Sequence, residues 1–113
     1  KNYKGMSPNG DMSTEYFIMQ GLPYADEFSV SFFNSLGSTV RTITHENAQE
    51  IEFDPSLITG GLREDEMVVW DGRASNGNPV PSGTYYFVVT YITYELEGPR
   101  GFDKTGYVVV ESE

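Results

Sequence analysis

The 113-residue sequence contains no cysteine, one histidine and only seven basic residues. Without cysteine it can form neither disulfides nor Cys-ligated zinc sites, and it offers no thiolate nucleophile. Seventeen acidic residues give a net charge of −10, and such a surface repels nucleic-acid phosphates and anionic membranes. No segment approaches the roughly 18 apolar residues of a membrane span. We therefore expect no nucleic-acid partner and no membrane insertion. The acidic surface keeps the domain soluble or, alternatively, attracts basic partners or Ca²⁺.

The length and the first residues bear on domain organisation. A chain of 113 residues has the usual size of one domain and is too short for two. It begins with Lys-Asn-Tyr-Lys-Gly, without an initiator Met or an apolar leader. We expect residues 1–113 to be a single domain cut from a larger protein.

Short runs rich in aromatic and β-branched residues recur along the chain, separated by Gly and Pro signals, and no window has the 3.6-residue apolar period of a helix. The expected strands are residues 15–19, 28–32, 38–43, 67–70, 84–94 and 106–111, with residues 50–53 as a short edge strand. This pattern predicts an all-β fold, an immunoglobulin/fibronectin type III-like β-sandwich of about seven antiparallel strands. A small barrel is the competing architecture.

The longest run, residues 84–94, is apolar on both of its alternating faces. One face would carry Tyr85, Phe87, Val89 and Tyr91, and the other Tyr86, Val88 and Ile92. A strand of this kind is expected to be central in its sheet and covered on both sides, by a second layer or by long loops.

Candidates for catalysis are few. A general base near neutral pH is most often histidine, and the single His45 lies in a polar stretch, as a solvated residue at a strand end would. The acidic run Glu64, Asp65 and Glu66 has the character of a solvated loop. No Gly-x-Ser-x-Gly elbow and no phosphate-binding glycine pattern occurs. We expect this domain not to be an enzyme.

The segment before the first expected strand places oxygen ligands at Asn9, Asp11 and Glu15. Ca²⁺ binds roughly six to eight oxygens of such side chains and of backbone carbonyls, but the spacing does not follow the EF-hand pattern. An Asx-type turn, with Asn9 and Asp11 bonded to nearby amides, is the simpler interpretation. Both interpretations stay open: no cofactor, or a calcium ion at these three residues.

Trp70 is followed by Asp71 and Gly72. An exposed Trp would suit a carbohydrate-stacking platform or an interface anchor. However, Trp70 ends an apolar run, as a core residue would, so we expect it to be buried and the Asp-Gly pair to form the turn that ends the strand.

Two linked motifs resemble a known surface module. They are the Ser-Pro-Asn-Gly-Asp opening at residues 7–11, and the Trp70-Asp71-Gly72 turn that leads to a strand starting Gly83-Thr84-Tyr85. The chain is similar over nearly its whole length to the fibronectin type III-like domains of cell-envelope subtilisin-like serine proteinases, the lactocepins and the streptococcal complement peptidase. At residues 12–15 it has Met-Ser-Thr-Glu where that family usually continues with Gly and an acidic pair. The resemblance itself therefore adds no support for a metal site.

The resemblance implies a non-catalytic accessory domain on the bacterial cell surface or wall. Such a domain spaces the catalytic domain, contacts neighbouring domains and helps to bind a protein substrate or host protein. Two other groups share the motifs: the C-terminal sorting domains of type IX secretion cargo and the immunoglobulin-like domain of flagellar hook-capping proteins. The segment between Ile43 and Trp70 is long for either, which favours the proteinase group. A sorting domain or another surface adhesion module is the alternative.

Overall fold

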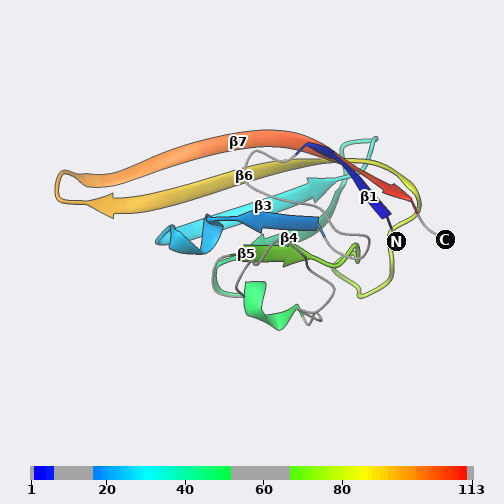
Figure 1. The fold of residues 1–113 in the computed structure, drawn as a ribbon, viewed down its shortest axis with the longest axis horizontal. Helices are drawn as coiled ribbons and strands as arrows, with labels where there is room; N and C mark the ends of the chain where they lie inside the picture. The colour runs from blue at the N-terminus through cyan, green and yellow to red at the C-terminus, as the bar shows by residue number, and fades with distance from the viewer. Residues whose placement is uncertain (1, 7–16, 52–66, 112–113) are drawn as a thin grey trace.

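The structure is a computed structural model, and it describes residues 2–6, 17–51 and 67–111. These residues form seven strands in two antiparallel sheets (Figure 1). The larger sheet has the order β1-β7-β6-β3-β4, and the smaller one pairs β2 with β5. The strands are β1 (Asn2–Met6), β2 (Phe17–Gln20), β3 (Glu27–Phe33), β4 (Thr39–Thr44), β5 (Met67–Trp70), β6 (Gly83–Glu95) and β7 (Gly98–Glu111).

The β3–β4 hairpin shows how local sequence sets the elements. Burial alternates strictly along β3, because its apolar residues recur with the two-residue period of a strand. The side chain of Asn34 accepts hydrogen bonds from the amides of Leu36 and Ser38, both 3.0 Å long, and Gly37 has a φ of 84°. The turn therefore has the side-chain acceptor and the left-handed glycine that a tight reversal requires.

The core lies between the two sheets. The smaller sheet contributes Phe17, Met19, Val68 and Trp70, and the inner face of the larger one contributes Phe28, Val30, Phe32, Ile43, Tyr85, Phe87, Val89, Val108 and Val110. Phe17 packs edge-on against Phe32, with ring centroids 6.2 Å apart. The predicted all-β immunoglobulin/fibronectin type III-like sandwich is thus confirmed. Two separate sheets, rather than one closed sheet, enclose the core.

The hairpin of β6 and β7 is the longest element, and its distal half extends past the rest of the sandwich as an arm (Figure 1). β3 pairs with β6 as far as Ile92, and β1 pairs with β7 only from Tyr107 to Glu111. Among the described residues, the tip from Thr93 to Arg100 is paired only with itself.

Several boundaries differ from the sequence-based expectations. Residues 2–6 were not expected to be a strand; they form β1 because β7 offers them a partner. Glu50 ends a short 3₁₀ turn, Ala48–Glu50, and the rest of the expected 50–53 edge strand lies outside the described residues, except for Ile51. β7 starts at Gly98 rather than at residue 106, because the hairpin continues past the sandwich.

The expectation that residues 84–94 would be covered on both faces is wrong. Tyr85, Phe87 and Val89 are buried, but Tyr86 is 50% exposed and Val88 37% exposed on the other face. The second layer covers only the inner face of the large sheet, so the outer face meets solvent. Within the described ranges no helix is long and apolar enough to cross a membrane.

Candidate functional site

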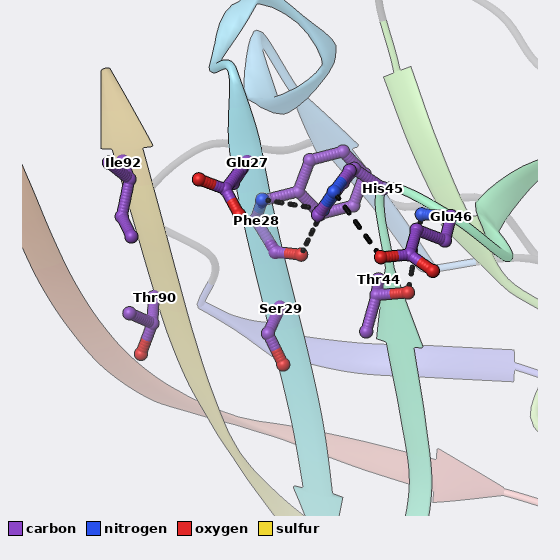
Figure 2. A pocket seen from close by; sticks show the side chains of 8 residues that line it. All are labelled: Glu27, Phe28, Ser29, Thr44, His45, Glu46, Thr90 and Ile92. Atoms are coloured by element: carbon purple, nitrogen blue, oxygen red, sulfur yellow. Dashed lines mark hydrogen bonds and ion pairs between the residues drawn. The ribbon is translucent and has the colours of Figure 1, made fainter. Parts of the chain in front are cut away.

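A shallow pocket of about 320 Å³ lies at the outer side of β3, β4 and β6 (Figure 2). Its walls combine hydroxyl, carboxylate, imidazole and apolar groups: Glu27, Phe28, Ser29, Thr44, His45, Glu46, Thr90 and Ile92. The three strands bring together residues that are up to 65 positions apart (Glu27 to Ile92). The pocket can donate and accept hydrogen bonds to a polar ligand.

His45 follows the last residue of β4, at a strand end as predicted. Its Nδ1 atom lies 3.3 Å from both the amide nitrogen and the carbonyl oxygen of Phe28. Its Nε2 atom lies 3.8 Å from a carboxylate oxygen of Glu46. Both ring nitrogens thus face structural neighbours, and within the described part of the chain no hydroxyl group is hydrogen-bonded to the ring.

Where β6 leaves the body, Tyr94 is held by two acidic residues. Its amide donates to a carboxylate oxygen of Asp26 at 2.6 Å, and its hydroxyl donates to Glu27. The hydrogen bond to Glu27 is the main reason why the pKa of Tyr94 lies above its usual value. These contacts fix the base of the arm beside the pocket.

Trp70 is fully buried, as predicted, and does not form an exposed platform. Its ring stacks on Phe32 at a centroid distance of 4.1 Å and meets Tyr85 edge-on at 6.0 Å. The indole N–H donates to the carbonyl of Arg73 at 3.0 Å. Trp70 therefore joins the core to the turn that follows it.

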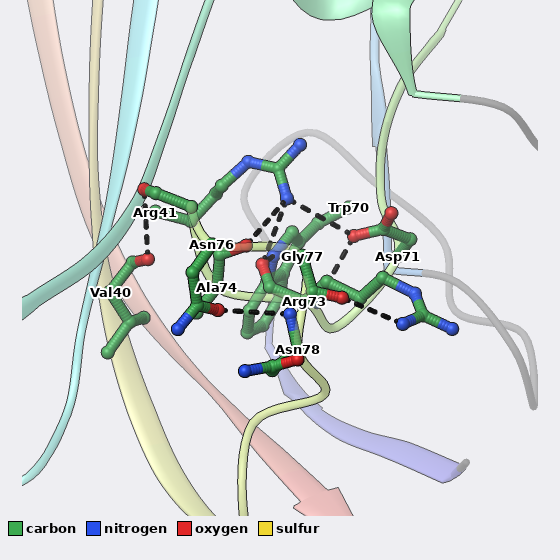
Figure 3. Close-up of polar contacts among 10 residues, drawn as sticks. Val40, Arg41, Trp70, Asp71, Arg73, Ala74, Asn76, Gly77 and Asn78 are labelled. Carbon is green, nitrogen blue, oxygen red and sulfur yellow. Dashed lines mark hydrogen bonds and ion pairs between the residues drawn. The ribbon is translucent and has the colours of Figure 1, made fainter.

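The turn after Trp70 is held by its own polar groups (Figure 3). Gly72 has a φ of 74°, the conformation that the expected Asp-Gly turn requires. The Asp71 carboxylate accepts from the amide of Arg73 at 3.1 Å, and the Asn76 side chain accepts from the amide of Asn78 at 3.0 Å. The Arg73 guanidinium donates to the carbonyl of Gly77 at 2.8 Å.

Arg41 on β4 fastens this turn to the large sheet (Figure 3). Its guanidinium donates to the carbonyls of Arg73 and Ala74, at 3.0 and 3.4 Å, and lies 3.6 Å from the Asp71 carboxylate. Ser75 also donates its amide to the carbonyl of Val40 at 2.9 Å. Sequence reasoning missed Arg41, because nothing local distinguishes it from a surface arginine on a strand.

The Gly-Thr-Tyr motif starts β6. Gly83 is its first residue, and the buried hydroxyl of Tyr85 donates to the carbonyl of Pro81 at 2.6 Å. Burial raises the pKa of Tyr85. The motif residues Trp70, Asp71, Gly72, Gly83 and Tyr85 thus form one end of the sandwich, and their contacts are structural.

The predicted calcium ligands Asn9, Asp11 and Glu15 lie outside the described residues, and so do Glu64, Asp65 and Glu66. Within the described residues no group of three or more His, Asp or Glu side chains could hold a metal ion.

The fold and these contacts define an immunoglobulin-like β-sandwich module. Residues 1–110 match the model of the CHU_C type IX secretion signal domain, and the chain belongs to that family. The match runs through the segment between Ile43 and Trp70, so the length of that segment does not set the chain apart from the family.

Part of C5a peptidase is also similar. The C5a peptidase of Streptococcus pyogenes serotype M1 is 32% identical over 95 residues, which cover 80% of this chain and 8% of the peptidase. A second Streptococcus pyogenes C5a peptidase is 31% identical over 93 residues. The chain thus spans less than a tenth of these relatives. Among solved structures, FlgD from Xanthomonas campestris aligns with a TM-score of 0.41 and 14% identity, over 96% of this chain and 64% of FlgD.

Proposed function

We propose that this chain is a non-catalytic module that directs the polypeptide carrying it to export through type IX secretion. The observation that carries the proposal is the family match over residues 1–110. It agrees with a domain whose described polar side chains mainly hold turns and the strand ends together. An export signal has to be presented as a stable surface, and this sandwich builds its core without any cysteine.

A fusion experiment tests this role. The chain is attached to the C-terminus of a secreted fluorescent reporter in a bacterium that has type IX secretion, and in the same strain with that system deleted. We expect reporter outside the cell only in the intact strain. A reporter that stays within the cell in both strains contradicts the proposal, provided that limited proteolysis shows the module to be folded.

The second candidate is the accessory role in a cell-surface serine proteinase. The similarity to C5a peptidase favours it, and it implies contacts with neighbouring domains and with a protein substrate. Deleting the module from its parent protein separates the two roles. If the module is a sorting signal, the parent protein without it stays inside the cell. An accessory module leaves export intact, but lowers kcat/KM for a large protein substrate without changing it for a short peptide.

Either role places the chain outside the cell and assigns it no catalysis. We expect the isolated 113-residue chain to cleave neither casein nor a chemokine substrate. Cleavage that the substitution His45→Ala abolishes would contradict this part of the proposal.

A further inference from the structure

A row of three aromatic rings crosses the exposed outer face of the five-stranded sheet, the face turned away from β2 and β5. Phe33, Tyr86 and Tyr107 lie directly opposite one another on β3, β6 and β7. Tyr86 is 50% exposed and Tyr107 42% exposed. Because neighbouring strands are about 4.8 Å apart, the row spans roughly 10 Å of sheet.

Hydroxyl-bearing residues lie next to this row on the same face of the sheet. The next outward positions are Ser31, Val88 and Thr105, which are also paired with each other, and Ser31 lies within 3.4 Å of the hydroxyl of Thr42. The outward position after Val88 on β6 is Thr90, which lines the pocket beside Ser29 and Glu27. Tyr86 and Thr90 are separated by about 13 Å at the usual strand rise. The ring row and the pocket are therefore parts of one surface.

The charges on this surface select against an anionic ligand. By the two-residue alternation of a strand, Glu27 on β3 and Asp103 on β7 occupy outward positions on this face. The structure describes the side chains of four cations, Arg41, Arg73, Arg100 and Lys104. None of these four lies on this face. Arg41 and Arg73 both donate to carbonyls of the turn after Trp70, and Arg100 and Lys104 alternate to the inner side of β7. The charged groups on this face whose side chains the structure describes are therefore carboxylates, and these repel a phosphate- or carboxylate-bearing polymer.

We propose that this outer face binds a neutral polysaccharide, with sugar rings stacked on Tyr86 and Tyr107 and sugar hydroxyls bonded in the pocket. The face of a tyrosine ring is apolar while its hydroxyl remains a hydrogen-bonding group, which matches the apolar faces and equatorial hydroxyls of a pyranose. The serine and threonine hydroxyls and the Glu27 carboxylate supply the further donors and acceptors that a neutral, hydroxyl-rich ligand needs. This inference does not depend on the export role.

The sheet itself disfavours an extended peptide as the occupant. A peptide that adds a strand pairs with free main-chain groups at a sheet edge. At the ring row, however, β3, β6 and β7 each have a strand on both sides, since Phe33 pairs with Thr39 and Tyr107 pairs with Met6. A stable interface with a second copy of the chain would bury roughly 800 Å² per partner around an apolar centre. Here the hydroxyl-bearing Ser31 and Thr105 flank Val88 beside the rings, so polar groups interrupt the apolar area.

Affinity electrophoresis of the 113-residue chain tests the proposal. The native gels contain soluble mixed-linkage β-glucan, xylan or galactomannan, with polygalacturonate as the anionic comparison. We expect retardation by at least one neutral polymer and none by polygalacturonate. Tyr86→Ala and Tyr107→Ala should each weaken binding about tenfold, and Tyr86→Phe should bind within about threefold of the original chain.

Tyr24→Ala is the matched control, since Tyr24 is 71% exposed in the short turn Leu22–Tyr24, away from this face. It should leave the affinity unchanged. The proposal is overturned if no neutral polymer retards the chain, if polygalacturonate does so equally, or if the tyrosine variants bind normally. Sedimentation that shows a dimer broken by Tyr86→Ala would overturn it too, because a second copy would then cover the face.

Discussion

The two ends of the β6–β7 hairpin differ in what holds them. At one end, Gly83 and Tyr85 lie beside a fully buried indole, and an arginine from β4 fastens the adjoining turn. At the other end, Leu96 is fully exposed and the tip pairs only with itself among the described residues. One pair of strands thus passes from a packed sandwich into a two-stranded ribbon. Strand pairing continues along the whole hairpin, whereas the packing against its two ends differs.

An apolar contact lies where the arm leaves the sandwich, since Tyr91 still packs against the core. Tyr91 and Phe102 stack with centroids 4.9 Å apart, and the guanidinium of Arg100 lies 5.6 Å from the centre of the Phe102 ring. Isolated two-stranded hairpins are marginally stable in water, so we expect this stack to stabilise the arm together with the bonds of Tyr94 to Asp26 and Glu27. The following substitutions test the contrast between the two ends.

The largest effect is expected for Trp70→Ala. Removing a fully buried indole from its stack on Phe32 should lower the free energy of unfolding by about 3–5 kcal/mol, measured by urea denaturation. Trp70→Phe, which keeps a ring in the core, should cost less than half as much. A native-state emission spectrum typical of a water-exposed indole in the original chain would contradict the buried position.

Arg41→Met should destabilise the chain by about 1–2 kcal/mol, because the carbonyls of Arg73 and Ala74 lose a charged donor. Arg100→Met makes the same chemical change on the arm, where the side chain is 63% exposed and 3.7 Å from Glu95. It should change the free energy of unfolding by less than about 0.5 kcal/mol, and therefore leave the urea midpoint nearly unchanged. Equal losses in the two variants would refute the assignment of Arg41 as the residue that fastens the turn.

Tyr85→Phe should lower stability by about 1 kcal/mol at neutral pH, because the buried hydroxyl no longer donates to Pro81. The substitution should also change how the stability of the chain declines at alkaline pH. Burial raises the pKa of Tyr85 in the folded chain, so the folded state favours the neutral phenol. This contribution is fully present below the unfolded pKa of about 10 and is lost as the pH rises above it. Thermal melts between pH 9 and pH 11 should therefore decline less steeply in the variant, and an unchanged slope would count against the linkage.

The smallest effects are expected on the arm. Phe102→Ala removes one ring of the stacked pair and should cost about 1 kcal/mol or less. Leu96→Ser at the exposed tip should be neutral within about 0.5 kcal/mol. Hydrogen exchange should show the amides of residues 95–100 opening at a lower free energy than those of residues 85–89. Equal protection of the two segments would mean that the arm is covered in solution.

Much of the sandwich could be predicted from the sequence. The alternation in residues 28–32, the turn at Asn34 and the Trp-Asp-Gly reversal are local signals, and each is found where it was expected. The position of Trp70 in the core also follows from the apolar run before it. By contrast, β1 has no alternation of its own, and the role of Arg41 depends on a turn 32 residues later in the chain. The calcium ligands stay a prediction, since they lie outside the described residues.

Residue order alone determined that the chain is all-β, where most of its strands reverse and which face of each strand is apolar, because turn chemistry and side-chain alternation act within a few residues. Only the tertiary structure decided which apolar face is covered. Tyr85 and Tyr86 are neighbours of the same type, yet one is buried under the second sheet and the other lies in the outer aromatic row. Burial depends on the packing of β2 and β5 over one side, and that contact is made by residues far away in the sequence.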